Sequence, residues 1–293
     1  MSENQKSPCA LFRAALSSHR PLIIPGVFNA LVARMAERAG FGAVYQSGAA
    51  LSAGLAAVPD VGLITQSEFS QQGGYIAQAV DIPVISDADT GFGEALSVER
   101  TMRLFESAGL AGLHLEDQQL PKRCGHLSGK TLVSEAEMIG KLKAAVSARR
   151  DQDFVIIART DARAVEGLEQ ALSRAQAYVE AGADMIFPEA LTTPEEFARF
   201  AEEVDVPLLA NMTEFGKSPL VTARELGEWG YAAVLFPVTL FRIAMKATES
   251  ALAQLAAEGT QKGLLGDMQT RAELYDLLGY DGYEDRDREY FGE

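Results

Sequence analysis

Residues 94–116 read EALSVERTMRLFESAGLAGLHLE, and this stretch contains the unit that decides the fold. Residues 94–108 have helical spacing, Gly109 closes the helix, and residues 111–116 form an apolar run that ends in a carboxylate. A continuous apolar run is typical of a parallel strand whose two faces are both covered. The stretch therefore predicts a helix followed by a buried parallel strand.

The same unit recurs along the chain, and eight repeats predict a closed (β/α)8 barrel of the TIM type. The structural alternative is a doubly wound open sheet, which usually has fewer units and often a glycine-rich phosphate turn. The expected strands are residues 21–26, 43–48, 83–89, 111–116, 154–160, 184–188, 206–211 and 232–237, and the expected helices between and around them are residues 29–39, 66–80, 94–108, 134–150, 167–181, 194–203 and 222–229.

The remaining segments flank these units within one predicted domain, residues 1–293. A short lead helix is expected at residues 11–17. A helical extension begins near residue 240, with helices at residues 240–258 and 267–278. The acidic and aromatic end, residues 280–293, is expected to pack weakly or to fray. A long helix left over after a closed barrel needs an apolar partner surface, which favours an oligomer.

Composition narrows the class of protein. The chain has 26 Lys and Arg against 41 Asp and Glu, a formal net charge of −15, which argues against binding to nucleic acid or an anionic membrane. Two cysteines, Cys9 and Cys124, fit a reducing cytoplasm better than a disulfide framework. Residues 1–8 lack the apolar core of a signal peptide, and no apolar stretch approaches the roughly 18 residues of a membrane span.

Polar groups follow nearly every predicted strand. In a barrel of this type, the catalytic groups collect at the carboxyl ends of the strands. Any one of these residues could be an ordinary loop residue, but a ring of them at one mouth is hard to explain by stability alone. They are Tyr45, Ser47, Gly48, Asp87, Asp89, Glu116, Arg159, Thr160, Asp161, Glu189, Asn211, Thr213, Glu214, Pro237 and Arg242.

Three of these groups are carboxylates on two consecutive strands. Asp87 and Asp89 lie on one side of an extended strand, and Glu116 ends the next strand. Such a cluster repels itself unless a cation is present. Oxygen ligands without histidine or thiolate suit Mg²⁺ or Mn²⁺, and Asp60 is a further candidate ligand. The alternative interpretation is that these acids cap the helices that follow.

The fourth strand leads into a loop that carries a thiol. Residues 116–130 read EDQQLPKRCGHLSGK, so Cys124 is flanked by Lys122, Arg123 and His126. Nearby positive charge favours the thiolate, so we expect Cys124 to ionise more easily than an ordinary cysteine. The alternative is a solvated loop with an incidental cysteine.

Seven motifs resemble the isocitrate lyase and phosphoenolpyruvate mutase superfamily, and within it the 2-methylisocitrate lyase family. The resemblance covers residues 11–283, and the KRCGH segment indicates the lyase-like part of the superfamily. The matching motifs are DADTGFG at 87–93, LEDQ at 115–118, KRCGH at 122–126, ARTDA at 158–162, FPEA at 187–190, NMTEFG at 211–216 and DMQTRAELY at 267–275.

The resemblance implies roles for individual residues. Cys124 matches the thiol that protonates a carbanion product, and Arg159 and His126 are further candidate catalytic residues. Tyr45 is our candidate for the group that takes the proton from the substrate hydroxyl. Asp87 matches a direct Mg²⁺ ligand, and Asp60, Asp89 and Glu116 match residues that hold metal-bound waters. Substrate-binding positions are matched by Ser47, Gly48, Ala49, Arg123, Gly125, His126, Arg159, Glu189, Asn211, Thr213, Arg242 and Arg271, and an apolar lining for an extra methyl group by Phe187, Leu235 and Pro237.

The family resemblance also implies an activity. It implies a cytoplasmic, Mg²⁺-dependent carbon–carbon lyase that cleaves 2-methylisocitrate to pyruvate and succinate in the methylcitrate cycle of propionate catabolism. It further implies a homotetramer in which a helix after the barrel is swapped between subunits. Gln46, Ala49 and the Leu-Ser-Gly-Lys of residues 127–130 depart from the usual family pattern. Isocitrate lyase, a dimethylmalate lyase, an oxaloacetate-processing relative and a non-catalytic barrel that binds a dicarboxylate and Mg²⁺ therefore stay as alternatives.

Overall fold

The computed structural model describes residues 6–18 and 21–292. The chain divides between Leu240 and Phe241 into two compact units. Residues 1–5 of the polar amino-terminal segment, for which no signal peptide is expected, lie outside the described residues. None of the helices in the described ranges combines the length and the apolar character that crossing a membrane requires.

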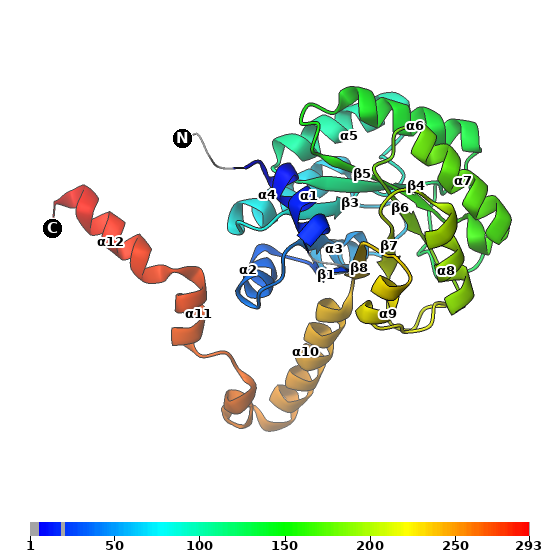
Figure 1. Cartoon of the computed structure of the whole chain (residues 1–293). Helices are drawn as coiled ribbons and strands as arrows, with labels where there is room; N and C mark the ends of the chain where they lie inside the picture. The colour runs from blue at the N-terminus through cyan, green and yellow to red at the C-terminus, as the bar shows by residue number, and fades with distance from the viewer. Residues whose placement is uncertain (1–5, 19–20, 293) are drawn as a thin grey trace. The chain divides into compact units, whose positions relative to one another are not determined.

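The first unit is built on a parallel sheet, drawn in Figure 1. Its strand order is β6-β5-β4-β3-β2-β1-β8-β7. A parallel bridge between Ile186 and Leu208 brings the edges β6 and β7 together, so the predicted (β/α)8 barrel is confirmed as a nearly closed barrel. The strands are β1 Leu22–Val27, β2 Val44–Gln46, β3 Val84–Asp87, β4 Gly112–Glu116, β5 Val155–Thr160, β6 Met185–Pro188, β7 Leu209–Asn211 and β8 Ala233–Phe236.

Helices surround the strands, as Figure 1 shows for α4 to α8. Most of them begin at a Ser, Thr or Asn whose side-chain oxygen accepts the backbone N–H three residues later. In the stretch that decides the fold, α5 ends before Gly109, whose φ of 90° suits glycine and turns the chain into β4. The helices of this unit are α1 Pro8–Ser18, α2 Ala30–Arg38, α3 Gly48–Ala56, α4 Gln66–Ala79, α5 Ala95–Ser107, α6 Glu135–Ala148, α7 Leu168–Glu180, α8 Pro194–Glu203 and α9 Ala223–Glu228, with a short 3₁₀ helix, η1 Ala162–Ala164.

The apolar residues divide into two layers. The outer layer fills the space between strands and helices, with Phe105 and Tyr178 fully buried. The inner layer fills the barrel and includes Ile157 and Phe187. Phe12 of α1 packs in the inner layer among the first residues of the strands, so the lead helix covers the amino-terminal end of the barrel. The polar groups lie at the opposite end of the barrel, where the strands have their carboxyl ends.

The clearest differences between the expected elements and the structure concern α3, β7 and the carboxyl-terminal helices. Helix α3 was not expected, and β7 begins at Leu209, three residues later than predicted. In the second unit, α11 begins at Arg271, because Thr270 caps it and the preceding residues form a 3₁₀ helix. Residues 280–291 form a helix, so they do not fray, but this helix buries none of its residues, in agreement with the expected weak packing. The carboxyl-terminal elements are α10 Thr239–Glu258, η2 Lys262–Asp267, α11 Arg271–Leu278 and α12 Tyr280–Phe291.

Candidate active site

Three buried carboxylates lie at the carboxyl ends of two neighbouring strands. Asp87 ends β3, Glu116 ends β4, and Asp89 follows two residues after Asp87. β3 and β4 pair in parallel, with His114 opposite Asp87. The backbone N–H of Asp89 donates to Asp87 Oδ1 at 2.8 Å, which fixes the turn after β3. The structure thus brings the three predicted acids to one end of the barrel.

Lys122 is the cationic centre of this carboxylate cluster. Its ammonium lies 2.5 Å from Asp60 Oδ1 and 2.6 Å from Asp89 Oδ1. Asp60 comes from the segment between α3 and α4, whereas Lys122 belongs to the loop of residues 117–130, which we call the cysteine loop. Burial opposes the charge on Lys122, but the surrounding carboxylates outweigh it and raise its pKa well above the ordinary lysine value.

The acids of the cluster differ in pKa because burial and neighbouring charges act on them unequally. Burial and the charge of Asp87 raise the pKa of Asp89 to about 7, although Lys122 opposes the shift. Burial raises the pKa of Glu116 well above its ordinary value, against the opposing charge of Arg159. Burial also acts on Asp87, but nearby cationic groups outweigh it and lower the pKa of that acid. The raised pKa values of Asp89 and Glu116 indicate that Lys122 and Arg159 do not offset the cost of ionising all three buried acids at once.

The oxygens of this cluster fit a divalent cation. Oε1 of Glu116 is buried and has neither a hydrogen-bond donor nor an ion-pair partner, whereas Glu116 Oε2 and Asp89 Oδ1 are contacted only by the cations of Arg159 and Lys122. Buried acceptors without a partner are rare in native proteins, and carboxylate oxygens are the ligands that Mg²⁺ prefers. Over the described ranges, no three His, Cys, Asp or Glu side chains are already grouped as a metal site. The fit therefore rests on the unpaired Glu116 Oε1 and on the all-oxygen chemistry of the carboxylate cluster.

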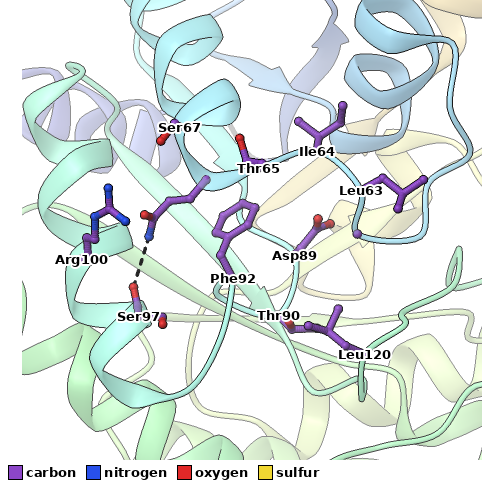
Figure 2. Close-up of a pocket in the computed structure, with 12 residues that line it drawn as sticks. Leu63, Ile64, Thr65, Ser67, Asp89, Thr90, Phe92, Ser97, Arg100 and Leu120 are labelled. Carbon is purple, nitrogen blue, oxygen red and sulfur yellow. Dashed lines mark hydrogen bonds between the residues drawn. The ribbon is translucent and has the colours of Figure 1, made fainter.

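A cavity of about 350 Å³ opens beside the cluster (Figure 2). Asp89 and Thr90 line it from the segment after β3, Ile64 lines it from the segment before α4, and Leu120 comes from the cysteine loop. Mg²⁺ in proteins usually retains several waters. The cavity offers space for such waters next to Asp89, and neither Cys124 nor Arg159 lines it.

The start of α3 lies against Asp87. Ser47 caps this helix by accepting the N–H of Ala50 at 3.3 Å. A Cβ atom placed on Gly48 would lie 2.3 Å from Asp87 Oδ2, so the close approach requires glycine. A helix amino terminus carries free N–H groups and partial positive charge, and both favour an anion. The segment containing Ser47, Gly48 and Ala49 therefore places the amino terminus of α3 next to the cluster, and its binding of a substrate carboxylate stays a prediction.

Tyr45 and His114 form a buried pair inside the barrel. The hydroxyl of Tyr45 lies 2.9 Å from His114 Nε2, and the same nitrogen lies 3.5 Å from Asp87 Oδ1. Burial raises the pKa of Tyr45 well above its ordinary value and, against the charge of Asp87, lowers the pKa of His114 to about 4. At neutral pH both side chains are therefore uncharged. His114 was not among the predicted site residues, although a histidine within an apolar strand, opposite Asp87 in the strand register, is a usable signal.

Arg159 is surrounded by carboxylates. Its guanidinium lies 2.9 Å from Asp161 Oδ2, 3.2 Å from Glu116 Oε2 and 3.7 Å from Glu189 Oε2. The guanidinium carbon also lies 5.3 Å from the centroid of the Phe187 ring. Burial opposes its charge, but the three acids raise the pKa of Arg159 still further above its ordinary value. Arg159 is a permanently charged group held rigidly at the barrel mouth.

The cysteine loop packs on Arg159 and Glu189. A Cβ atom on Gly125 would lie 2.4 Å from Cγ of Glu189 and 2.6 Å from Nη2 of Arg159. His126 Nε2 lies 2.7 Å from Glu189 Oε1, and its Nδ1 accepts the backbone N–H of Lys217 at 2.9 Å. Because Nδ1 accepts, the ring proton resides on Nε2 and faces Glu189. Burial acts to raise the pKa of Glu189, but Arg159 and His126 outweigh it and lower that pKa.

The expectation that Cys124 ionises easily is wrong. Although Cys124 keeps an exposed surface, partial desolvation of its thiol raises its pKa above the ordinary value of 9.0. The charge of Glu189 adds to this shift, against the His126 backbone N–H and Arg159. The loop cations are engaged elsewhere, since Lys122 pairs with Asp60 and Asp89. Arg123 donates to the carbonyl of Ser128 at 3.3 Å. A protonated thiol at neutral pH suits a proton donor.

Alkylation of Cys124 should therefore be slow at neutral pH. Cys124 is exposed and not disulfide-bonded, so the reaction rate reports its thiolate fraction. Because the pKa is raised, we expect iodoacetamide to modify the native protein more slowly at pH 8 than the urea-unfolded protein. The native rate should keep rising with pH and level off only above pH 9.0, because the thiolate fraction saturates above the pKa. Mass spectrometry of the Cys124 peptide gives both rates, and a native rate above the unfolded one would contradict the raised pKa.

The remaining predicted residues are distributed over both units. The side chain of Asn211 donates to Glu189 Oε2 at 3.2 Å, and Thr213 follows shortly after it. Phe187 and Leu235 belong to the inner apolar layer. Pro237 follows β8, and its carbonyl lies close to Gly26. Arg242 and Arg271 belong to the second unit, and their contact with a substrate stays a prediction.

Two comparisons define the class of protein to which these features belong. The profile of the family described as phosphoenolpyruvate phosphomutase matches residues 12–256. The solved structure of 2,3-dimethylmalate lyase, named as a member of the same superfamily as isocitrate lyase, superposes with a TM-score of 0.92 at 34% identity, covering 98% of this chain and 96% of that one. The chain belongs to the phosphoenolpyruvate mutase and isocitrate lyase family.

Sequence comparison identifies a closer group of relatives. 2-Methylisocitrate lyase from Aeropyrum pernix is 54% identical over 287 residues, which covers 98% of this chain and 92% of the relative. Phosphonopyruvate hydrolase, solved in complex with oxalate and Mg²⁺, superposes with a TM-score of 0.88 at 33% identity, covering 98% of this chain and 100% of that one.

Proposed function

We propose that this protein is a Mg²⁺-dependent carbon–carbon lyase that cleaves 2-methylisocitrate to pyruvate and succinate. The observation that carries the proposal is the packing of the cysteine loop on Arg159 and Glu189, beside the carboxylate cluster at the same barrel mouth. This arrangement combines a protonated thiol, fixed positive charge and hard oxygen ligands. The 54% identity to a 2-methylisocitrate lyase supports the choice of substrate.

Substrate binding would depend on local positive charge, because the whole chain is acidic. The amino terminus of α3, with Ser47 and Gly48, would bind one substrate carboxylate. Arg159 would bind another, since its planar guanidinium suits carboxylate oxygens. The amide of Asn211 and the ring of His126 surround Glu189 and would orient further polar groups.

Cleavage transfers one electron pair and two protons. The hydroxyl of the tertiary alcohol loses its proton, its oxygen forms the carbonyl of pyruvate, and the carbon–carbon bonding pair passes to the succinate fragment as a carbanion. Cys124 then donates its proton to that carbon, and its raised pKa keeps the proton available at neutral pH. The cysteine loop would exclude water, which otherwise quenches the carbanion.

Tyr45 and His114 are the proposed route for the hydroxyl proton. Both side chains are neutral at pH 7, and the phenol lies 2.9 Å from an imidazole nitrogen that can accept a hydrogen bond. Tyr45 would take the proton from the substrate hydroxyl and pass its own phenol proton to His114. Neither side chain would then become an isolated buried anion. The position of His114 beside Asp87 would stabilise the imidazolium that forms.

Asp87, Asp89, Glu116 and Asp60 are the residues proposed to hold Mg²⁺, either directly or through water. When bound, Mg²⁺ would supply Lewis-acid stabilisation of the negative charge that develops on the substrate oxygens. Phosphonopyruvate hydrolase, which has a related fold, was solved with Mg²⁺ and oxalate, and this supports the choice of Mg²⁺ as the cation. Mn²⁺ has similar ligand preferences and is a possible substitute.

The second candidate is a dimethylmalate lyase, favoured by the superposition with 2,3-dimethylmalate lyase. That structure is 34% identical to this chain, against 54% for the 2-methylisocitrate lyase relative. Phe187, Leu235 and Pro237 form the proposed lining for the methyl group. A methylene or methyl group in an apolar pocket changes selectivity by only about 1–3 kcal/mol, so several related acids need to be compared directly.

The test is release of pyruvate by the purified protein. With Mg²⁺ present, 2-methylisocitrate should be cleaved with a higher kcat/KM than isocitrate, 2,3-dimethylmalate or oxaloacetate, as the 54% identity to a 2-methylisocitrate lyase favours. EDTA should abolish the reaction, and restored Mg²⁺ should recover it. Faster glyoxylate release from isocitrate would move the assignment to isocitrate lyase, and turnover of dimethylmalate alone would establish the second candidate.

We further propose a cytoplasmic homotetramer in which a carboxyl-terminal helix packs on a neighbouring subunit. Ile243 and Leu252 of α10 are 63% and 60% exposed in the single chain, and large exposed apolar side chains favour a protein partner. Light scattering of the purified protein can test this assembly.

A further inference from the structure

A buried lysine joins two parts of the barrel mouth that the mechanism above does not connect. Lys130 ends the cysteine loop, and its side chain is only 1% exposed. Its ammonium donates to Asp161 Oδ1 at 2.6 Å and also donates to the carbonyl of Gly125. One cation therefore ties the middle of the cysteine loop to a carboxylate that directly follows β5.

Asp161 is held rigidly at its other contacts. It accepts Arg159 through both oxygens, from Nε at 2.9 Å and from Nη2 at 3.3 Å. Its backbone N–H donates to Asp117 Oδ1 at 2.8 Å, and Asp117 Oδ2 accepts the hydroxyls of Thr160 and Tyr178. Asp161 thus links the ammonium of Lys130 to the guanidinium of Arg159, while Asp117 holds the backbone of Asp161 in place.

Stability alone is a weak explanation for this pair. Desolvation of two buried charges can cost more than their attraction returns, so buried ion pairs often add little to stability. The other anchors of the loop use groups of the active site itself, since Lys122 pairs with proposed metal ligands and His126 pairs with Glu189. The Lys130–Asp161 pair is an anchor that can be altered without changing those groups.

We propose that Lys130 and Asp161 are positioning residues that hold the cysteine loop against Arg159, so that the thiol of Cys124 and the guanidinium act on one substrate. The inference rests on the proposed lyase function for its catalytic consequence. Its structural part, control of the loop, stands independently of the substrate. Because Gly125 packs within van der Waals distance of Arg159 and Glu189, release of its carbonyl would let the loop backbone move away from both.

Hydrogen-exchange mass spectrometry of Lys130→Met tests the structural part. The N–H of Leu127 donates to the Cys124 carbonyl at 2.9 Å, and the N–H of Arg123 donates to Gln118 Oε1 at 2.9 Å, so the loop has amides whose exchange reports opening. We expect exchange in peptides 117–130 to rise at least about tenfold, as loss of a charge-assisted hydrogen bond implies, while α5 keeps its protection.

The kinetic part uses the same variant. We expect kcat/KM for 2-methylisocitrate to fall on the order of 10²-fold. Most of this loss should be a lower kcat with little change in KM, because misplacement of Cys124 affects the transition state more than substrate binding. The matched control is Arg149→Met, which breaks an ion pair of 2.7 Å with Asp184 at the amino-terminal end of the barrel. That variant should lose comparable stability without faster exchange in the loop.

Three results would overturn the inference. The first is unchanged hydrogen exchange in the cysteine loop of folded Lys130→Met. The second is an equal rise of exchange in the loop and in α5, which would mean global destabilisation. If Lys130→Met does not fold, Asp161→Asn takes its place because it keeps the shape of the site and removes the charge, and unchanged loop exchange in Asp161→Asn is the third result. The unmodified protein could cleave none of the tested acids while the variants still show faster exchange in the loop. This result would support the positioning role and reject the proposed lyase function.

Discussion

Replacing Cys124 by serine is expected to lower kcat for 2-methylisocitrate by about 10²–10⁴-fold, the usual contribution of a general acid. A serine hydroxyl has nearly the same shape but is a far weaker acid, so it cannot deliver a proton to the carbanion in time. KM should change little, because the proton is transferred only after the substrate is bound. Steady-state pyruvate release measures both constants.

The matched control is the only other cysteine of the chain, Cys9. Cys9 lies buried on α1, where its thiol faces the carbonyl of Leu110 at 3.8 Å, and burial raises its pKa to about 12. Cys9→Ser should keep the kcat of the unmodified protein. If Cys124→Ser also keeps it, the thiol is not the proton donor, and the proposed mechanism loses its acid.

The Asp87→Asn variant is expected to lose both activity and the response to Mg²⁺. Loss of the carboxylate removes the proposed direct ligand while keeping the size of the side chain. Lewis-acid catalysis contributes several kcal/mol, so kcat should fall by about 10³-fold. Because a ligand that binds only the folded state stabilises it, Mg²⁺ should raise the Tm of the unmodified protein and not that of Asp87→Asn.

Asp184→Asn is the control for this second prediction. Asp184 pairs with Arg13 and Arg149 at the amino-terminal end of the barrel, so its loss should lower Tm without altering the response to Mg²⁺. An equal shift of Tm by Mg²⁺ in the Asp87→Asn variant and in the unmodified protein would show that the metal binds elsewhere. The unpaired oxygen of Glu116 in the carboxylate cluster would then need another explanation.

The sequence predicted regular elements better than short or weakly patterned ones. The eight apolar runs each follow a helical stretch, and their positions agree with the strands within a few residues. Helix α3 was missed because its nine residues, GAALSAGLA, are rich in Ala and Gly and carry no amphipathic period. Ser47 was selected as a substrate-binding hydroxyl, and the structure shows that the same side chain also caps this helix.

The electrostatics of the site depended on contacts that span long distances in the chain. Proximity in sequence suggested that Lys122 acts on Cys124, whereas the folded chain places its ammonium between Asp60 and Asp89. Lys130 meets Asp161 across 31 positions, and His114 meets Tyr45 across 69. No local pattern encodes such pairs.

The sequence by itself determined the barrel, the end of it that carries polar groups, the carboxylates of Asp87, Asp89 and Glu116, and the thiol of Cys124. These follow from periodicity and from the rule that parallel strands end at one mouth. Only the tertiary structure decided which charges pair, which acids have a raised pKa and what holds the cysteine loop. The reason is physical, since burial and charge pairing depend on distances between side chains from different strands and loops, and those distances exist only after the barrel has closed.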